Sequence, residues 1–241
     1  MAGENARRII LDETDSTNSY AKRLLAGGFE GEAVITAKRQ TAGRGRQGKS
    51  FYSPGGTGLY LSVILRPDAN DGQFTLLTAA TAVAVCEAIE EHTALVPEIK
   101  WVNDIYIGDR KVCGILCESV FREGRLDAVV AGIGINLTTT DFPLELDAVA
   151  GSLGFDKDSE ALTRSIAGRL FELCDSLSDR SFMEYYRSHS CVIGKDISFT
   201  DAGVTYKARA LSIDDGGGLR VLLENGQQKL LSGGEISLRL K

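Results

Sequence analysis

The chain has 241 residues, of which 43% are hydrophobic and 25% charged, and its formal net charge is −6. This length allows one domain, or one domain with a small second one, and the composition is that of an ordinary globular protein. The acidic balance argues against a protein that coats nucleic acid through its overall field. The most apolar stretch, residues 76–86, is shorter than the roughly 18 to 20 residues of a membrane span, so no membrane segment is expected.

Export is not expected either, because the N-terminal MAGENARRII contains no apolar core of signal-peptide length. Five cysteines are an odd number and do not look like a disulfide framework, so we expect free thiols in the cytoplasm. Cys113 and Cys117 are close in sequence, but the histidines His92 and His189 are distant from them. Core packing is therefore expected for this pair rather than a zinc site.

In chain order, the first predicted elements are a strand over residues 9–11 and a helix through residue 25. Side chains of residues 15–17 are expected to cap the helix, and Gly27 and Gly28 to end it. Apolar periodicity then predicts strands over 33–38 and 59–65 and a long helix over 74–92. Further strands are expected over 99–101, 105–107, 111–119 and 127–136, joined mostly by hairpin turns such as 108–109 and 123–124.

The second half begins with helices over 144–150, 159–177 (capped by Ser159) and 182–190. Short β-type runs follow over 197–200, 205–213, 219–222, 228–231 and 236–240, with turns at 216–218 and 225–226. A small β-barrel of roughly 45 to 50 residues fits these runs, and so small a core would lean on the main domain. The predicted fold is α+β, with a mixed, largely antiparallel sheet flanked by helices in residues 1–190 and a β domain in residues 191–241.

Residues 39–49, RQTAGRGRQGK, form a segment that we call the basic loop. It lies in a stretch with no acidic residue between Glu32 and Asp68. Its glycines allow backbone amides to approach a ligand, and its guanidinium groups match phosphate oxygens. The segment 43–50 also matches the P-loop pattern, but the following FYSPGG cannot begin the helix that a P-loop requires. The alternative without a function is that the basic loop is a flexible, solvated segment. That alternative does not explain why so much positive charge is concentrated there.

Three more clusters are candidates for a ligand site. Residues 100–104, KWVND, place polar groups at a strand end, although a simple turn at Asn103 and Asp104 would give the same pattern. Lys111 begins an apolar strand and could point its ammonium group into a site, although a solvated lysine is common there. Residues 132–136, GIGIN, permit close approach of the backbone within a strand.

Together and in this order, these clusters and residues 15–18, DSTN, resemble the biotin protein ligases, in the form without an N-terminal DNA-binding domain. The resemblance covers residues 15–136 in motifs, and the β-rich tail is similar to the SH3-like C-terminal domain of that family. It implies a catalytic domain related to class II aminoacyl-tRNA synthetases. No helix-turn-helix is seen before Ile9, so neither repression nor specific DNA binding is implied.

The resemblance implies that the protein uses ATP to make biotinyl-5′-AMP and pyrophosphate, and transfers biotin to a lysine of a carrier domain. Acetyl-CoA carboxylase or pyruvate carboxylase would supply this domain, and the ligase would be a monomer or weak homodimer. Lys111 and Arg44 are the residues to which the resemblance assigns catalytic roles. The implied biotin site comprises Ser16, Thr17, Asn18, Gln40, Gly43, Arg44, Gly45, Arg46, Lys111 and Gly114.

The implied ATP site comprises Arg46, Lys49, Phe51, Lys100, Asn103, Asp104 and Asn136. Mg²⁺ is expected with ATP, but the sequence does not identify the metal ligands. Two positions depart from the family pattern: Phe51 stands where tryptophan is frequent, and Val102 where proline is usual. A lipoate or octanoate ligase or transferase is the main alternative. A nucleic-acid-binding module that uses the basic loop is a second one, from another functional class.

Overall fold

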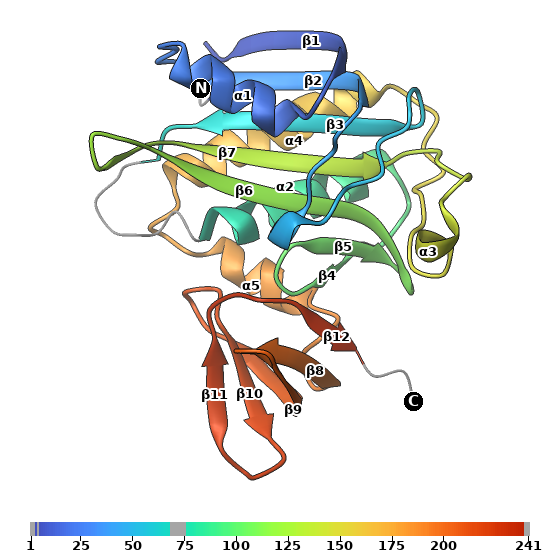
Figure 1. Cartoon of the computed structure of the whole chain (residues 1–241), viewed down its shortest axis with the longest axis vertical. Helices are drawn as coiled ribbons and strands as arrows, with labels where there is room; N and C mark the ends of the chain where they lie inside the picture. The colour runs from blue at the N-terminus through green and yellow to red at the C-terminus, as the bar shows by residue number, and fades with distance from the viewer. Residues whose placement is uncertain (1–2, 4, 68–75, 239–241) are drawn as a thin grey trace.

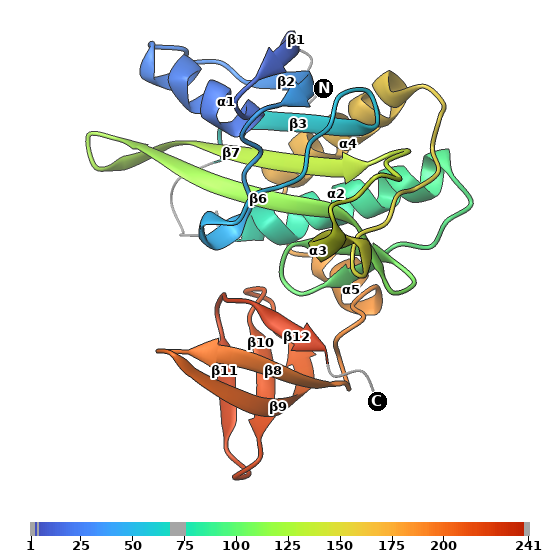
Figure 2. The same cartoon turned by 45° about the vertical axis from the view of Figure 1, so that its right-hand side comes forward.

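The computed structural model describes residues 3, 5–67 and 76–238. Two sheets organise the chain, a large one above a small one in Figures 1 and 2. The large sheet has the order β1-β2-β3-β7-β6-β5-β4. Its strands are β1 Arg7–Thr14, β2 Ala33–Gln40, β3 Gly58–Leu65, β4 Glu98–Lys100, β5 Asp104–Ile107, β6 Arg110–Arg122 and β7 Arg125–Asn136. β1 and β2 run parallel and the other neighbours antiparallel, as expected of a mixed, largely antiparallel sheet.

Helices cover both faces of this sheet. α1 (Thr17–Ala26) packs on one face, where its residues Ala21 and Leu25 meet apolar side chains of the sheet. α2 (Leu77–His92) and α4 (Ser159–Asp175) lie on the other face, over the larger core (Figure 1). α2 is apolar almost all round, which is typical of a helix buried between a sheet and other helices. The predicted start of this helix at residues 74–75 lies outside the described residues.

The small sheet is antiparallel and has the order β11-β10-β9-β8-β12. Its strands are β8 Asp196–Asp201, β9 Val204–Ile213, β10 Leu219–Leu223, β11 Gln228–Leu231 and β12 Ile236–Leu238. The α+β fold with a second small β unit is confirmed. Residues 239–240, which were expected to extend the last strand, lie outside the described residues.

The small sheet leans on the large one, as its limited core requires. Its buried side chains, such as Ile197 and Val221, join the same apolar cluster as α2. The Trp101 indole N–H donates to the Gly217 carbonyl at 2.9 Å across this contact. α5 (Phe182–Ser188) lies between the two sheets in Figure 1.

The two predicted N-caps differ in outcome. The N-cap of α1 is Ser16, within the predicted residues 15–17, but its side chain makes no capping bond; the amide of Thr17 donates instead to Gln40 Oε1 at 2.8 Å. Because Gln40 reaches this helix end from another strand, local sequence could not reveal it. At α4, the cap is Asp158 rather than Ser159, and its carboxylate accepts from the amides of residues 160 and 161.

Three helix ends also differ from the prediction. α3 is shorter than expected, Leu144–Asp147, because a turn follows it and Ala150 bridges to Lys111 of β6. α4 ends at Asp175, before the expected residue 177, and α5 ends at Ser188 rather than residue 190. The expected turns at Gly108, Gly124 and Gly226 are present, each with a positive φ that suits glycine.

Candidate functional site

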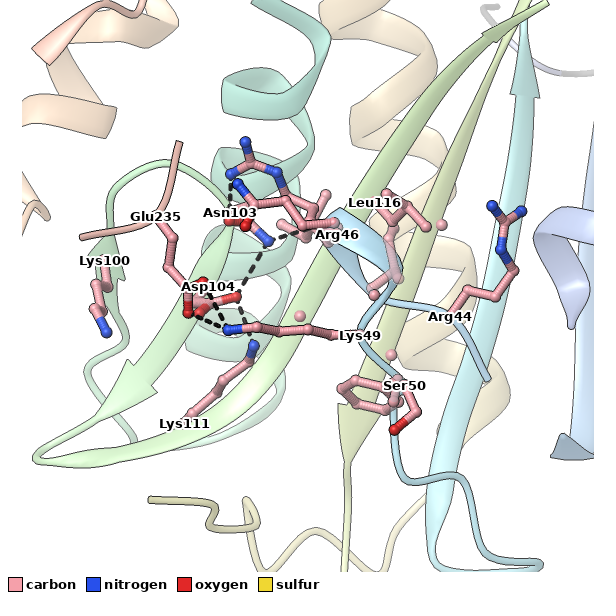
Figure 3. A pocket seen from close by; sticks show the side chains of 18 of the residues that line it. Arg44, Arg46, Lys49, Ser50, Lys100, Asn103, Asp104, Lys111, Leu116 and Glu235 are labelled. Atoms are coloured by element: carbon pink, nitrogen blue, oxygen red, sulfur yellow. Dashed lines mark hydrogen bonds and ion pairs between the residues drawn. The ribbon is translucent and has the colours of Figure 1, made fainter. Parts of the chain in front are cut away.

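A cavity of about 340 Å³ opens where the start of α1, the basic loop, β6 and β7 meet the segment before β12 (Figure 3). Most of the residues predicted for the ligand site line it. They are Ser16, Thr17, Asn18, Gln40, Arg44, Gly45, Arg46, Lys49, Phe51, Lys100, Asn103, Asp104, Lys111 and Gly114. The structure therefore brings together segments that are far apart in the sequence.

One wall of the cavity is neutral and made by the start of α1. Ser16, Thr17 and Asn18 are each less than 5% exposed. Gln40 Oε1 accepts from the Thr17 amide, and Gln40 Nε2 donates to Ser53 Oγ at 3.0 Å. These groups offer hydrogen-bond donors and acceptors without net charge, which suits an uncharged polar ligand.

Ser62 does not line the cavity but supports this wall, and the sequence analysis missed it. It is fully buried in β3, with Oγ 2.7 Å from Thr17 Oγ1 and 2.6 Å from Asn18 Oδ1. A buried hydroxyl needs a hydrogen-bond partner. The lone serine within the apolar run of residues 59–65 could therefore have indicated a buried polar contact at this strand.

Glycines on β6 and β7 make room for two of the predicted residues. A Cβ on Gly132 would lie 2.2 Å from Asn18 Oδ1, and one on Gly134 would lie 2.5 Å from Phe51 Cε1. A Cβ on Gly114 would be 3.3 Å from the same ring. The phenyl ring of Phe51 thus lies close to the backbone of two strands, where it forms part of the cavity wall.

The basic loop is folded back on itself above the cavity. Gly45 N donates to Lys49 O at 2.7 Å, and Phe51 N donates to Gly43 O at 2.9 Å. A Cβ on Gly43 would lie 2.4 Å from the Phe51 carbonyl oxygen. Gly43 thus closes the base of the loop and does not line the cavity.

The structure of this segment is not that of a P-loop. A short 3₁₀ turn, η1 (Arg46–Gly48), stands where a P-loop would lead into an α-helix, and Gln47 within it has a φ of 54°. The chain after Ser50 then continues without helix to β3, which begins at Gly58. The helix N-terminus that holds phosphate in a P-loop is not formed here.

The opposite wall of the cavity is charged. Lys111 Nζ lies 2.7 Å from Asp104 Oδ1, and Asn103 Nδ2 donates to the same oxygen at 3.2 Å. Arg46 Nη1 donates to Asn103 Oδ1 at 3.0 Å. Figure 3 shows these side chains converging, whereas the guanidinium group of Arg44 points away from them. Cations thus gather on one side of the cavity.

The segment before β12 contributes to this charged wall and was missed. Lys49 Nζ lies 2.5 Å from Glu235 Oε1, and Gly234 O accepts from Arg46 Nη1 at 3.1 Å. The hydrogen bond from Lys49 lowers the pKa of Glu235 below its ordinary value. Lys49 and Glu235 are 186 residues apart, so only the folded chain reveals the pair. The other lining residues that the predicted site did not include are Gln47, Ser50, Trp101, Tyr106, Ile115, Leu116, Gly132, Ile133, Gly134, Leu146, Val149 and Ile236.

Two predicted ATP residues lie at the margin of this wall. Lys100 Nζ is 5.4 Å from the centre of the Tyr106 ring, and burial raises the pKa of that tyrosine to about 12. Asn136 lies outside the cavity lining: its Nδ2 donates to the Gly151 carbonyl at 2.9 Å. Asn136 therefore holds the chain just after α3; Leu146 of α3 and Val149 after it line the cavity.

Comparison with known proteins agrees with this geometry. Residues 10–136 match the biotin/lipoate A/B protein ligase family, and residues 192–239 match the biotin protein ligase C-terminal domain. A bifunctional ligase/repressor BirA of Bacillus subtilis is 34% identical, over 93% of this chain and 72% of its own length. A biotin–[acetyl-CoA-carboxylase] ligase of Mycobacterium tuberculosis is 30% identical, over 98% of this chain and 90% of its own length.

Among solved structures, a biotin protein ligase from Aquifex aeolicus in complex with biotin and ATP matches with a TM-score of 0.81. The match has 30% identity and covers 98% of this chain and 99% of the other. The chain belongs to the biotin/lipoate A/B protein ligase family, among the biotin protein ligases. None of the helices in the described part of the chain has the length and apolar character that a membrane crossing requires.

Proposed function

We propose that the protein activates biotin with ATP and transfers it to one lysine of the carrier domain of a biotin-dependent carboxylase. The observation that carries this proposal is the division of the cavity into a neutral wall and a cationic wall. The first suits the uncharged ring system of biotin, and the second suits its carboxylate and the phosphates of ATP. The Aquifex relative binds both of these molecules.

On the neutral wall, Ser16, Thr17, Asn18 and Gln40 would hold the ureido ring. The side chains of Thr17, Asn18 and Gln40 already form one hydrogen-bonded network with Ser62, so little side-chain entropy is lost when a ligand binds. Gly114 leaves the backbone of β6 accessible beside them.

On the cationic wall, Lys111 would stand between the biotin carboxylate and the α-phosphate of ATP. Its charge lowers the repulsion between two anions that must approach before they react. A carboxylate oxygen then attacks the α-phosphorus, and the bond to pyrophosphate breaks. In the second step, the lysine amine of the carrier domain attacks the carbonyl carbon, and AMP leaves.

Arg46, Lys49 and Lys100 would neutralise the phosphates, and the ring of Phe51 would pack on the adenine. Phenylalanine lacks the indole N–H of the tryptophan frequent in the family, but it keeps a flat face for stacking. In the free protein Lys49 is paired with Glu235, so ATP must replace or rearrange this contact. Asn136 would act from outside the cavity, by holding the segment of Leu146 and Val149.

Mg²⁺ would enter with ATP and neutralise phosphate charge. Asp104 and Asn103 offer oxygen atoms of the type that Mg²⁺ prefers, at the edge of the cationic wall. Among the described residues, no group of three or more His, Cys, Asp or Glu side chains could hold a metal ion. This fits an ion held by one or two protein oxygens together with phosphates and water.

The basic loop would cover the intermediate. Gly43 and Gly45 give its backbone freedom, and Arg44 anchors its first part on β6 through Glu118, at 3.2 Å. A closed loop would keep water from the reactive mixed anhydride until the carrier domain arrives. Arg44 thus supports catalysis through the position of the loop.

Several wider features belong to this proposal. Residues 1–190 would form the catalytic domain and 191–241 the C-terminal domain; the match over 192–239 supports this division. The acceptor would be acetyl-CoA or pyruvate carboxylase, and the enzyme a monomer or weak homodimer. Use of ATP and the odd number of cysteines favour the cytoplasm.

Mass spectrometry of a biotin carrier domain incubated with the protein, biotin and Mg-ATP tests the whole proposal. One added biotin on one lysine is the expected result. Biotin-dependent exchange of labelled pyrophosphate into ATP tests the first step alone. The lipoate alternative is not favoured, because residues 192–239 match the C-terminal domain of biotin protein ligases. Exchange with lipoate and not with biotin would nevertheless reverse this assignment.

A further inference from the structure

Glu118 lies on β6, just beyond the cavity lining. Its only role in the proposed function is contact with Arg44. It follows Leu116 on the same face of the strand, because strand side chains alternate in direction. Its side chain is 19% exposed. A carboxylate this far buried needs partners of opposite charge.

Side chains from two other parts of the chain meet at this carboxylate. Arg44 of the basic loop faces it with both terminal nitrogens, Nη1 3.2 Å from Oε2 and Nη2 3.2 Å from Oε1. From α1, Asn18 Nδ2 donates to Oε2 at 3.0 Å and Lys22 Nζ to Oε1 at 2.8 Å. Glu118 thus connects the basic loop to the helix that forms the neutral wall.

The carboxylate is ionised at neutral pH. Burial alone would raise the pKa of Glu118, but hydrogen bonds from Lys22 and Asn18 and the charges of Lys22 and Arg44 lower it below its ordinary value. Bidentate bonds between a guanidinium and a carboxylate are directional and stronger than neutral hydrogen bonds. The contact therefore sets the direction in which the loop leaves residue 43.

Two observations indicate that the contact between Arg44 and Glu118 positions the loop and is more than a surface ion pair. Lys22 already supplies one cation to Glu118, so Arg44 is not needed for charge balance at this site. The basic loop also contains Gly43, Gly45 and Gly48, which restrict its backbone little. Arg46 and Lys49 hold the later part of the loop through Asn103, Gly234 and Glu235, so the contact of Arg44 with Glu118 is the one that holds its first part.

We propose that Glu118 is a positioning residue for adenylate formation and retention. It binds both Arg44 at the start of the basic loop and the side-chain amide of Asn18. The position of the loop relative to the neutral wall is thereby fixed. Glu118 touches no reacting atom and acts through Arg44 and Asn18. The proposal rests on the function proposed above.

The first test uses the free protein and trypsin. Glu118→Gln removes the charge that holds Arg44 but keeps an oxygen that can accept from Asn18. Cleavage after Arg44 should become about threefold to tenfold faster, the range for a lost half-exposed ion pair. Lys22→Met is the matched control, because it removes an ion pair from the same carboxylate and leaves Arg44 in place. Its cleavage rate should stay within about twofold of the wild type. Equal acceleration in both variants, or none in Glu118→Gln, would overturn the proposal.

The second test measures release of biotinyl-adenylate after loading with biotin and Mg-ATP. Release should be about threefold to tenfold faster in Glu118→Gln and within about twofold of wild type in Lys22→Met. Adding Glu118→Gln to Arg44→Met should cause no further change, because both act on one contact. Unchanged release in Glu118→Gln, or additive effects, would refute the positioning role. If the wild type forms no adenylate, the proposed function fails, while the trypsin test still decides whether Glu118 anchors the loop.

Discussion

Lys111 Nζ lies 2.7 Å from Asp104 Oδ1 at the edge of the cavity, so the lysine that the family resemblance places at the reaction centre is paired in the free protein. The pair keeps the ammonium group at the cationic wall and prevents it from turning into solvent. Its partner is 21% exposed and the lysine side chain 31%, so the pair is only partly screened by water. In the proposed mechanism the ammonium group shares or leaves this carboxylate when biotin and ATP bind.

Lys111→Ala should therefore lower the rate of adenylate formation by about 10²-fold or more, the usual loss when one preorganised charge is removed. Pyrophosphate exchange measures this rate. The fold should persist, because the Lys111 backbone remains paired with Val149 and Gly151. Circular dichroism and the melting temperature serve as controls. Normal exchange kinetics in a folded variant would remove Lys111 from the mechanism.

Arg44→Gly should weaken retention of the intermediate by about tenfold, equivalent to ~1.4 kcal/mol. Loss of the bidentate contact with Glu118 frees the start of the basic loop, and a mobile cover opens more often. Free biotinyl-adenylate would then label lysines of bystander proteins, which a streptavidin blot detects. If labelling did not rise, the role assigned to Arg44 in covering the intermediate would be wrong.

Gly134→Ala should weaken ATP binding while biotin binding changes little. The new Cβ would lie 2.5 Å from Phe51 Cε1, so the ring must move from the place proposed for stacking on adenine. Gly114→Ala is a milder change at the same ring, since its Cβ would lie 3.3 Å from Phe51 Cε2 and 3.4 Å from Lys111 Nζ and needs only a small adjustment; its ATP affinity is the measure compared, because Gly114 also belongs to the proposed biotin site. Calorimetry with a non-hydrolysable ATP analogue and with biotin separates the two ligands. Equal ATP affinity in both variants would contradict the place given to Phe51.

The sequence predicted elements that depend on local periodicity and turns. Burial could be predicted directly from the apolar runs of β3, β7 and the helix α2. The turns at Gly108 and Gly124 could be predicted from the glycines themselves. Most of the site residues that the family motifs indicated also line the cavity. Such features can be predicted without knowing which distant residues each segment contacts in the fold.

Features that depend on distant partners were missed. The amide of Thr17 is satisfied by Gln40, and Lys49 is paired with Glu235 of the small sheet. Gly43 was expected in the ligand site, but the structure shows it closing the base of the loop. For Thr17 and Lys49 the deciding contact joins separate segments, whereas for Gly43 it lies within the folded-back loop; no local sequence pattern encodes either kind of contact.

Ser62→Ala should reduce both stability and biotin affinity. The hydroxyl is fully buried in β3 and contacts Thr17 and Asn18, so its loss leaves buried polar atoms with fewer partners, at a cost of about 1 to 3 kcal/mol. Urea unfolding measures the first effect, and calorimetric titration with biotin the second. Thr81→Val is a suitable control, because Thr81 is equally buried in α2 but bonds to Leu77 of its own helix, away from the cavity. Both variants should lose stability, whereas only Ser62→Ala should bind biotin more weakly. Equal biotin affinity in the two would show that the network around Ser62 does not shape the neutral wall.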